Sequence, residues 1–227
     1  SWEIVDGALQ YRTAAATLDP AMAPHSDVAV EIKDASAWTL ETAFRHVSGT
    51  VPVSQYETVL YVCWAADKPG YIGLLCLCYD PERKQLDFLN GDAKAEPIAA
   101  DLTGGFHRVR IAVAERQVSV YLDGERKAGP APLGSMKYEA PPQFIIGPIT
   151  RTEPHDLVCR WDYFAFTDEA AFAPDDTRWD PSNDTEPVGI AADTRGPAPE
   201  DPQAFLKHPP YPNIHVLSKE RGTAAYD

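Results

Sequence analysis

The amino-acid sequence predicts an all-β protein in which two antiparallel sheets pack as a sandwich, followed by an extended proline-rich arm. Short apolar runs that alternate with polar positions recur up to about residue 173, and turn signals separate them. Two runs, Val59–Ala65 and Tyr71–Tyr79, are apolar at nearly every position. Strands of this kind are covered on both faces, so we expect them in the middle of the sandwich.

The clearest element is a predicted hairpin at Phe106–Gly124, with the sequence FHRVRIAVAERQVSVYLDG. Apolar residues alternate along 109–113 and again along 118–122, on either side of the polar corner Glu115-Arg116. Period-two alternation on both sides of a short polar loop is typical of an antiparallel hairpin with one buried face.

The other strands follow from the same alternation and from the turn residues between them. In chain order we predict strands at Trp2–Arg12 with a turn at Asp6-Gly7, Val28–Ile32, Trp38–Val47, Val59–Ala65, Tyr71–Tyr79, Leu86–Leu89, Gln143–Ile146 and Leu157–Thr167. Turn signals lie at Asp67-Lys68-Pro69-Gly70, Asp80–Lys84 and Asn90-Gly91-Asp92. Regular spacing of short strands and turns is typical of a sandwich or barrel.

The character of the chain changes after Phe172. Residues 174–227 are rich in proline and show little periodicity, so this segment lacks the apolar density to build a core of its own. We therefore divide the chain into a β-sandwich at 1–173 and a C-terminal extension at 174–227. Scattered apolar residues in the extension favour an arm packed on the sandwich over a linker to another domain.

Composition excludes some classes of partner. The net charge of −14 argues against a nucleic-acid-binding surface and against docking on anionic lipid. No apolar run approaches the roughly 20 residues that a membrane span needs. The chain begins at Ser1, and we expect a secreted or envelope protein whose leader has been removed.

Four cysteines, Cys63, Cys76, Cys78 and Cys159, lie in apolar strand-like runs. The Cys76-x-Cys78 spacing places both thiols on the same face of a strand. We expect buried free thiols that behave as small hydrophobic residues. Disulfides in an exported protein are the alternative, and the sequence does not fix their pairing.

The strings FHRVR at 106–110 and VSVYLDG at 118–124 resemble the hairpin of the concanavalin A-like lectin/glucanase superfamily, in particular of laminin-G-like domains. Phe106 stands where these domains commonly have tryptophan. The opening strand and the closing WDYF at 161–164 also look like the ends of such domains. The resemblance covers about residues 1–173 and implies a jelly roll with one convex and one concave sheet, on which many relatives bind glycans.

This resemblance does not decide between binding and catalysis, because the superfamily includes lectins, hydrolases, lyases and adhesion modules. Retaining glucanases of this fold carry Glu-x-Asp-x-x-Glu on one strand, and their two carboxyl groups lie about 5–5.5 Å apart. That motif is absent, and Glu31 and Asp34, its nearest fragment, would point to opposite faces of a strand. Arg108-x-Arg110 and Asn213-Ile214-His215 match only parts of the lyase patterns.

A sugar-binding groove requires an aromatic face for the apolar side of a ring and polar groups for its hydroxyls. Such side chains share one predicted face of the hairpin, and along the closing strand Arg160 and Asp162 are expected to alternate with Trp161 and Tyr163. The candidate ligand-binding residues are Arg108, Arg110, Tyr121, Arg160, Asp162 and His46. The alternative is that these are ordinary solvated positions. His107 falls on the apolar parity of its strand, which favours a core or edge histidine over a catalytic one.

Acidic and amide side chains gather at the predicted turns. They are Asp67, Asp80, Asn90, Asp92 and Asp123. Calcium requires several converging oxygen ligands, and superfamily members that use calcium hold it on rim loops. One Ca²⁺ is therefore a candidate cofactor, although turns are rich in Asp and Asn without any metal.

The leading hypothesis is a carbohydrate-binding, lectin-like recognition domain of a secreted or envelope protein. The first alternative is a glycan-active enzyme, either a glycoside hydrolase or a polysaccharide lyase, whose catalytic set no motif identifies. The second alternative is a structural domain that uses the proline-rich arm for oligomerisation. The expected partner is a glycan or polysaccharide, with a homo-oligomer formed through the arm as a further candidate.

Overall fold

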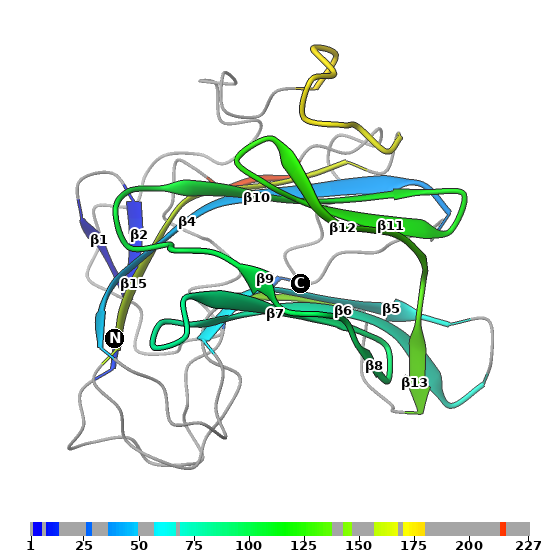
Figure 1. Ribbon diagram of the computed structural model, residues 1–227, viewed down its shortest axis with the longest axis horizontal. Helices are drawn as coiled ribbons and strands as arrows, with labels where there is room; N and C mark the ends of the chain where they lie inside the picture. The colour runs from blue at the N-terminus through cyan, green and yellow to red at the C-terminus, as the bar shows by residue number, and fades with distance from the viewer. Residues whose placement is uncertain are drawn as a thin grey trace.

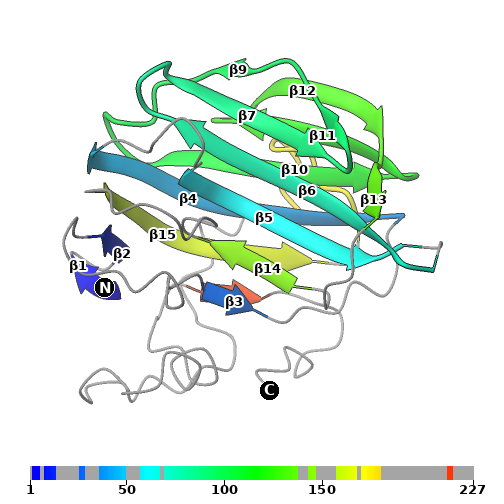
Figure 2. The same cartoon turned by 90° about the horizontal axis from the view of Figure 1, so that it is seen from below.

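The computed structural model describes residues 2–5, 8–13, 26–28, 36–49, 57–66, 69–137, 143–146, 157–167, 170–179 and 214–216. Within these residues every regular element is a β-strand, and the strands form two sheets that face each other (Figures 1 and 2). Among the residues described, no helix is long and apolar enough to cross a membrane. The predicted all-β, two-sheet antiparallel sandwich is therefore confirmed.

The first sheet, sheet A, has the order β1-β2-β15-β4-β10-β11-β12, with β16 beside β15. Its strands are β1 (Trp2–Val5), β2 (Ala8–Thr13), β4 (Trp38–Gly49), β10 (His107–Ala114), β11 (Gln117–Leu122), β12 (Glu125–Pro132), β15 (Leu157–Thr167) and β16 (Ile214–Val216). The pairing of β15 with β16 is parallel, whereas the other described pairs in this sheet are antiparallel.

The second sheet, sheet B, has the order β3-β14-β5-β6-β7-β8, with β13 beside β6 and β9 beside β7. Its strands are β3 (Ser26–Val28), β5 (Glu57–Ala65), β6 (Tyr71–Asp80), β7 (Gln85–Asn90), β8 (Ala93–Lys94), β9 (Ile98–Ala99), β13 (Ser135–Lys137) and β14 (Gln143–Ile146). The two runs that are apolar throughout, β5 and β6, lie in the middle of this sheet, as predicted.

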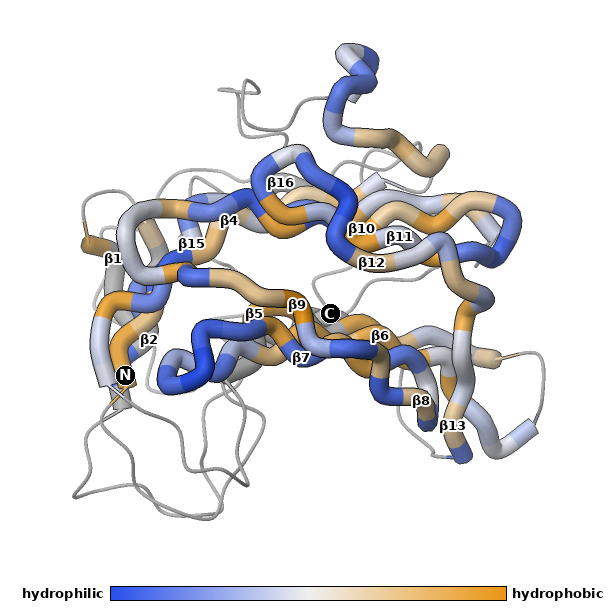
Figure 3. The backbone as a smooth tube through the Cα atoms, viewed as in Figure 1, coloured by the Kyte–Doolittle hydropathy of each residue, from blue (hydrophilic) through white to orange (hydrophobic). Residues whose placement is uncertain are grey.

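The hydrophobic core fills the space between the sheets, where Figure 3 shows apolar stretches along the strands and hydrophilic residues at the turns. The β4 residues Trp38, Leu40 and Phe44 are completely buried and face the other sheet. Trp38 meets Trp64 edge to face, with 5.9 Å between ring centroids, an arrangement that aromatic pairs prefer. The alternation in the sequence thus identifies the core-facing side of β4.

The predicted hairpin is formed by β10 and β11, and two tight turns set its register. Glu115 and Arg116 have φ angles of 50° and 61°, and Asp123 and Gly124 have φ angles of 51° and 86°. Positive φ at both central residues gives the turn a twist that matches that of antiparallel strands. The second turn leads into β12, a strand that the hydrophobic pattern did not reveal because it is polar and contains prolines.

The alternation of apolar and polar residues did not predict several short or polar strands. Besides β12, they are β8, β9, β13 and β16. Of the strand predicted at Val28–Ile32, the structure describes only Val28, the last residue of β3, and 29–35 lie outside the described residues.

All four cysteines are free and buried, which confirms the expectation of unpaired thiols. Cys76 and Cys78 share the face of β6 that points away from the main core, and their Sγ atoms are 3.3 Å apart. The hydrogen bond with Cys78, together with burial, raises the pKa of the Cys76 thiol. Cys76 is therefore held as a thiol rather than as a reactive thiolate.

The predicted boundary at residue 173 falls within a segment that lies against the sandwich. Residues 170–179, yellow in Figure 1, run over the face of sheet A that points away from sheet B. Farther along, β16 pairs with β15 through Phe164 and Ile214. The remainder of the C-terminal extension lies outside the described residues.

A close approach between the two central strands of sheet B gives a test of the packing. Gly73 lies opposite Trp64, and a Cβ at position 73 would be 2.0 Å from Trp64 Cε2. We expect Gly73→Ala to lower the free energy of unfolding by about 1–3 kcal/mol, because the indole has no space to move within the core. Urea denaturation measures the loss. Gly104→Ala is the control, since a Cβ there meets nothing within 4 Å, and equal stabilities of the two variants would contradict the packing.

Candidate functional site

The face of sheet A that points away from the core carries the polar residues predicted to bind ligand. Arg108 and Arg110 alternate with core residues of β10, and Arg110 lies directly opposite Tyr121 of β11. The predicted common face of Arg110 and Tyr121 is therefore present. The degree of exposure differs sharply, because Arg110 is fully buried while Arg108 and Tyr121 are half-buried.

Arg110 is buried in an ion pair with Glu41 of the neighbouring strand β4. Its Nε donates to Glu41 Oε2 at 2.5 Å, and both side chains are only 2% exposed. The hydroxyl of Tyr163 donates to the other oxygen of the same carboxylate. A carboxylate removed from water is stable only when its oxygens accept hydrogen bonds, and these two donors meet that requirement.

Residues 170–179, which we call the covering segment, close over this ion pair. Arg110 Nη1 donates to the carbonyl oxygens of Ala173 at 2.8 Å and Phe172 at 3.3 Å. The Trp179 ring stacks on Phe172, and the Arg110 guanidinium lies 4.9 Å from the Trp179 ring centroid. Thr39 fastens the segment to β4, because its hydroxyl oxygen accepts from Phe172 N at 2.7 Å. A ligand has no access to Arg110 while this segment is in place.

Side chains do not alternate along β15 as predicted, because Tyr163 lies on the opposite face from the one expected. Trp161 lies opposite Phe44 and Phe164 opposite Thr42, so Asp162 and Tyr163 together face a single residue of β4. This β-bulge inserts one residue and changes the parity of the strand. Tyr163 therefore does not share the core face of Trp161 and instead reaches Glu41 on the outer face.

A carboxylate beside a tyrosine hydroxyl, as Glu41 is beside Tyr163, can activate a phenol as a nucleophile, but the pKa of Tyr163 is shifted in the wrong direction for this role. Burial, followed by the negative charge and the hydrogen bond of Glu41, raises the pKa of Tyr163 far above its usual range. A nucleophilic phenol would need the opposite shift. The Glu41–Tyr163–Arg110 cluster is therefore a structural contact beneath the covering segment.

A second set of polar residues lies on the same face toward the other end of β4. Arg160 of β15 is directly opposite both Gln10 of β2 and Arg45 of β4. Arg160 Nε donates to Gln10 Oε1 at 2.7 Å. The last paired residues of β10 and β4 are His107 and Phe44. Phe106, one residue before His107, therefore lies beside Arg45, one residue after Phe44. Asp162, also a predicted ligand residue, is half-buried one row away in the bulge.

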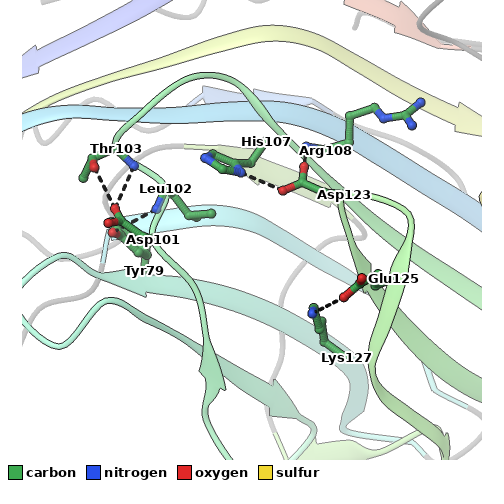
Figure 4. Close-up of polar contacts among 9 residues, drawn as sticks. All are labelled: Tyr79, Asp101, Leu102, Thr103, His107, Arg108, Asp123, Glu125 and Lys127. Atoms are coloured by element: carbon green, nitrogen blue, oxygen red, sulfur yellow. Dashed lines mark hydrogen bonds and ion pairs between the residues drawn. The ribbon is translucent and has the colours of Figure 1, made fainter.

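Phe106 is the one exposed aromatic side chain among those whose burial the structure describes, with 41% of its surface accessible. The loop before it is anchored at Leu102, whose carbonyl accepts from His46 N at 2.8 Å and whose amide donates to the Tyr79 hydroxyl at 3.2 Å. Asp101 accepts from both the amide and the hydroxyl of Thr103 (Figure 4). An ordered loop therefore presents an apolar ring at this end of sheet A.

His107 follows Phe106 and is held by an aspartate. Its Nδ1 lies 2.7 Å from Asp123 Oδ2, while Asp123 Oδ1 accepts from Arg108 N at 2.8 Å. Figure 4 shows the Arg108 guanidinium directed away from this pair. His107 is a partly exposed edge histidine, as its parity predicted, and its contact with Asp123 fixes the turn after β11.

His46 was predicted to bind ligand, and the structure places it on the core side of β4. The side chain is buried, and its ring centroid lies 5.6 Å from that of Tyr79. From this position it packs between the sheets and does not contribute to the outer face.

Among the described residues, the side chains predicted to bind calcium do not converge. Asp80 accepts hydrogen bonds from the backbone amides of Glu82 and Arg83 in the turn between β6 and β7. Asn90 lies at the other end of β7, where its side chain is hydrogen-bonded to the backbone of Pro132 and Gly134. Asp92 is exposed, and Asp67 lies outside the described residues. In the described parts of the chain, no group of three or more His, Cys, Asp or Glu side chains is placed to hold a metal.

Comparison with known proteins identifies fold neighbours but no family. No protein-family model and no curated protein matches the chain. Among solved structures, a Trypanosoma rangeli sialidase is similar with a TM-score of 0.51 and 20% identity, over 76% of this chain and 27% of that chain. At this identity the likeness shows the fold alone, and the chain spans about a quarter of the sialidase's length.

Two solved alginate lyases give weaker matches. Alginate lyase A1-II′, described as a member of polysaccharide lyase family 7, has a TM-score of 0.49 and 14% identity, over 72% of this chain and 80% of that chain. AlgAT5 of the same family has a TM-score of 0.45 and 10% identity, over 73% and 81% of the two chains. These neighbours are glycan-active proteins by their own descriptions. With no matching family model, the concanavalin A-like assignment stays a resemblance.

Removing one partner of the buried ion pair tests its structural role. We expect Arg110→Met to lower the free energy of unfolding by about 3–5 kcal/mol, because Glu41 is left buried without its cation. The double variant Arg110→Met/Glu41→Leu is expected to be more stable than Arg110→Met, since no lone charge remains. Denaturant titration of the three proteins measures both differences. A loss below about 1 kcal/mol for Arg110→Met, a size typical of exposed pairs, would contradict the burial.

The raised pKa of Tyr163 predicts a loss of stability at alkaline pH. The unfolded chain releases the phenolic proton near pH 10 while the folded protein retains it, so the free energy of unfolding falls as pH rises above about 10. Tyr163→Phe removes this contribution, and we expect a shallower decline than in wild type. Denaturation between pH 8 and about 11 measures the two slopes, and parallel curves would show that Tyr163 titrates normally.

Proposed function

We propose that this sandwich is a glycan-recognition domain that binds on the outer face of sheet A. The observation that carries the proposal is the concentration of arginines and aromatic side chains on that face, in a chain whose net charge is −14. Arg45, Arg108 and Arg160 are half-buried there, and Phe106 is exposed at the edge. An exposed apolar ring beside clustered cations on an otherwise acidic protein indicates a local binding surface.

The chemistry of this face suits a sugar ring. Aromatic side chains stack against the apolar face of a ring, and guanidinium groups donate hydrogen bonds in fixed directions to hydroxyl or acidic oxygens. Arginine stems also cover apolar surface while their charged ends reach solvent. Such a surface binds without any catalytic group, and no open catalytic set is formed by the side chains described on this face. A secreted or envelope location, where extracellular glycans are met, is part of the proposal.

A glycan-active enzyme is the second candidate, and the comparisons taken alone favour it. The protein that shares the fold is a sialidase, a glycan-processing enzyme, although this chain spans 27% of its length. Against this candidate, Glu41, which contacts both Arg110 and Tyr163, is only 2% exposed beneath the covering segment.

A polysaccharide panel separates the two candidates. We expect the purified protein to bind at least one polysaccharide by isothermal titration calorimetry without generating reducing ends or unsaturated uronates. Binding is expected to survive EDTA, because the described carboxylates form no calcium site. Product formation would establish the enzyme instead, and a protein that neither binds nor cleaves any member of the panel would contradict both candidates.

A further inference from the structure

Two arginines occupy directly opposite positions on adjacent strands of sheet A. Arg45 of β4 and Arg160 of β15 are register partners on the outer face. The side chains of directly opposed residues in antiparallel strands lie about 4.5–5.5 Å apart at Cβ, and like charges in this relation are destabilising. We therefore expect the Arg45–Arg160 pair to lower the stability of the unliganded protein.

Among the described residues, Arg45 also has an unsatisfied hydrogen-bond donor. Its Nε is shielded from solvent and has no hydrogen-bond acceptor. A buried donor without an acceptor costs about 1–3 kcal/mol. Arg110, one strand away, shows the contrasting arrangement, since Glu41 and two carbonyl oxygens satisfy its guanidinium.

An anion bound between the two guanidinium groups would accept a hydrogen bond from Arg45 Nε. It would also reduce the repulsion between Arg45 and Arg160. Arginine binds carboxylate and sulfate oxygens through charge-assisted hydrogen bonds, often with two parallel bonds. In the register, Asp162 of β15 lies opposite Ala43 rather than Arg45. On the two strands beside β4, no described carboxylate therefore lies directly opposite Arg45.

An exposed aromatic ring completes the surface. Phe106 directly precedes β10, at the position next to Arg45, and Val47 of β4, 37% exposed, lies at the same end of the sheet. The row that runs across the four strands contains Gln10, Arg160, Arg45 and Phe106. A flat apolar ring beside two cations matches a sugar that has one apolar face and one acidic substituent.

We propose that Arg45 and Arg160 bind the anionic group of an acidic glycan, a carboxylate or a sulfate, while Phe106 contacts the sugar ring. The inference rests on the proposed glycan-recognition function and adds the chemical class of the ligand. Binding supplies Arg45 with the acceptor that the fold does not provide and neutralises the opposed charges. Only the end of the face away from the covering segment takes part.

The test uses the full chain with three related polysaccharides: dextran, dextran sulfate and polygalacturonate. We expect binding to the two acidic polymers and none to dextran, with affinity that falls as salt is raised, since ionic contacts are screened. Arg45→Gln is expected to weaken binding at least tenfold. Arg126→Gln is the matched control, because Arg126 is an exposed arginine opposite Tyr121 on the same face and its loss changes the net charge equally.

Stability of the unliganded variants separates a binding role from a structural one. Arg45→Gln is expected to melt at the same temperature as wild type or higher, because it removes an opposed charge and an unsatisfied donor. Arg45→Lys keeps the charge without the forked geometry, and we expect it to bind between wild type and Arg45→Gln. A clear drop in melting temperature for Arg45→Gln would show that the side chain has an internal partner and would overturn the proposal.

The remaining outcomes distinguish the site from the wider function. Acidic polymers that bind wild type, Arg45→Gln and Arg126→Gln equally would overturn the anion site and leave glycan recognition standing. Binding of dextran as tight as that of dextran sulfate would overturn the acidic specificity. If no polymer binds but inorganic sulfate raises the melting temperature of wild type and not of Arg45→Gln, the anion site stands and the glycan function fails.

Discussion

The ion pair between Arg110 and Glu41 is the constraint on which the outer face of sheet A depends. Two charges withdrawn from water must satisfy each other and every remaining hydrogen-bonding position, or the fold loses several kcal/mol. Tyr163 and the carbonyl oxygens of Phe172 and Ala173 fill those positions. The covering segment is therefore required by the sheet beneath it. As a result, the part of the face around Arg110 is closed by the covering segment.

The architecture was predictable because its cause is local. Each core strand carries a period-two pattern, and β5 and β6 are apolar on both faces because both of their faces are buried. Strands such as β12 were not predictable, since their partners hold them in place and their own residues are polar. The predicted site was correct in identifying the face shared by Arg110 and Tyr121. It did not anticipate that a segment beyond the last core strand would bury one of them.

Two details of the site depend on information that alternation does not contain. The bulge in β15 moves Tyr163 from the expected core side to Glu41, and a bulge leaves no mark in the hydrophobic pattern when aromatic residues occupy both faces. The opposition of Arg45 and Arg160 depends on the register between strands that are more than a hundred positions apart in the chain. The signal for Arg45 was nevertheless present, because the parity of β4 that buries Phe44 sends its neighbour to the outer face.

Two arginines on one sheet differ in their surroundings: Arg110 is hydrogen-bonded within the fold, whereas Arg45 Nε has no acceptor among the described residues. An NMR titration of ¹⁵N-labelled protein with a polygalacturonate oligosaccharide tests this division most directly. The account predicts that the largest amide shifts cluster at Arg45, Phe106 and Arg160, while Arg110 and the covering segment change little. Shifts concentrated on sheet B or on the covering segment, with Arg45 unmoved, would contradict it.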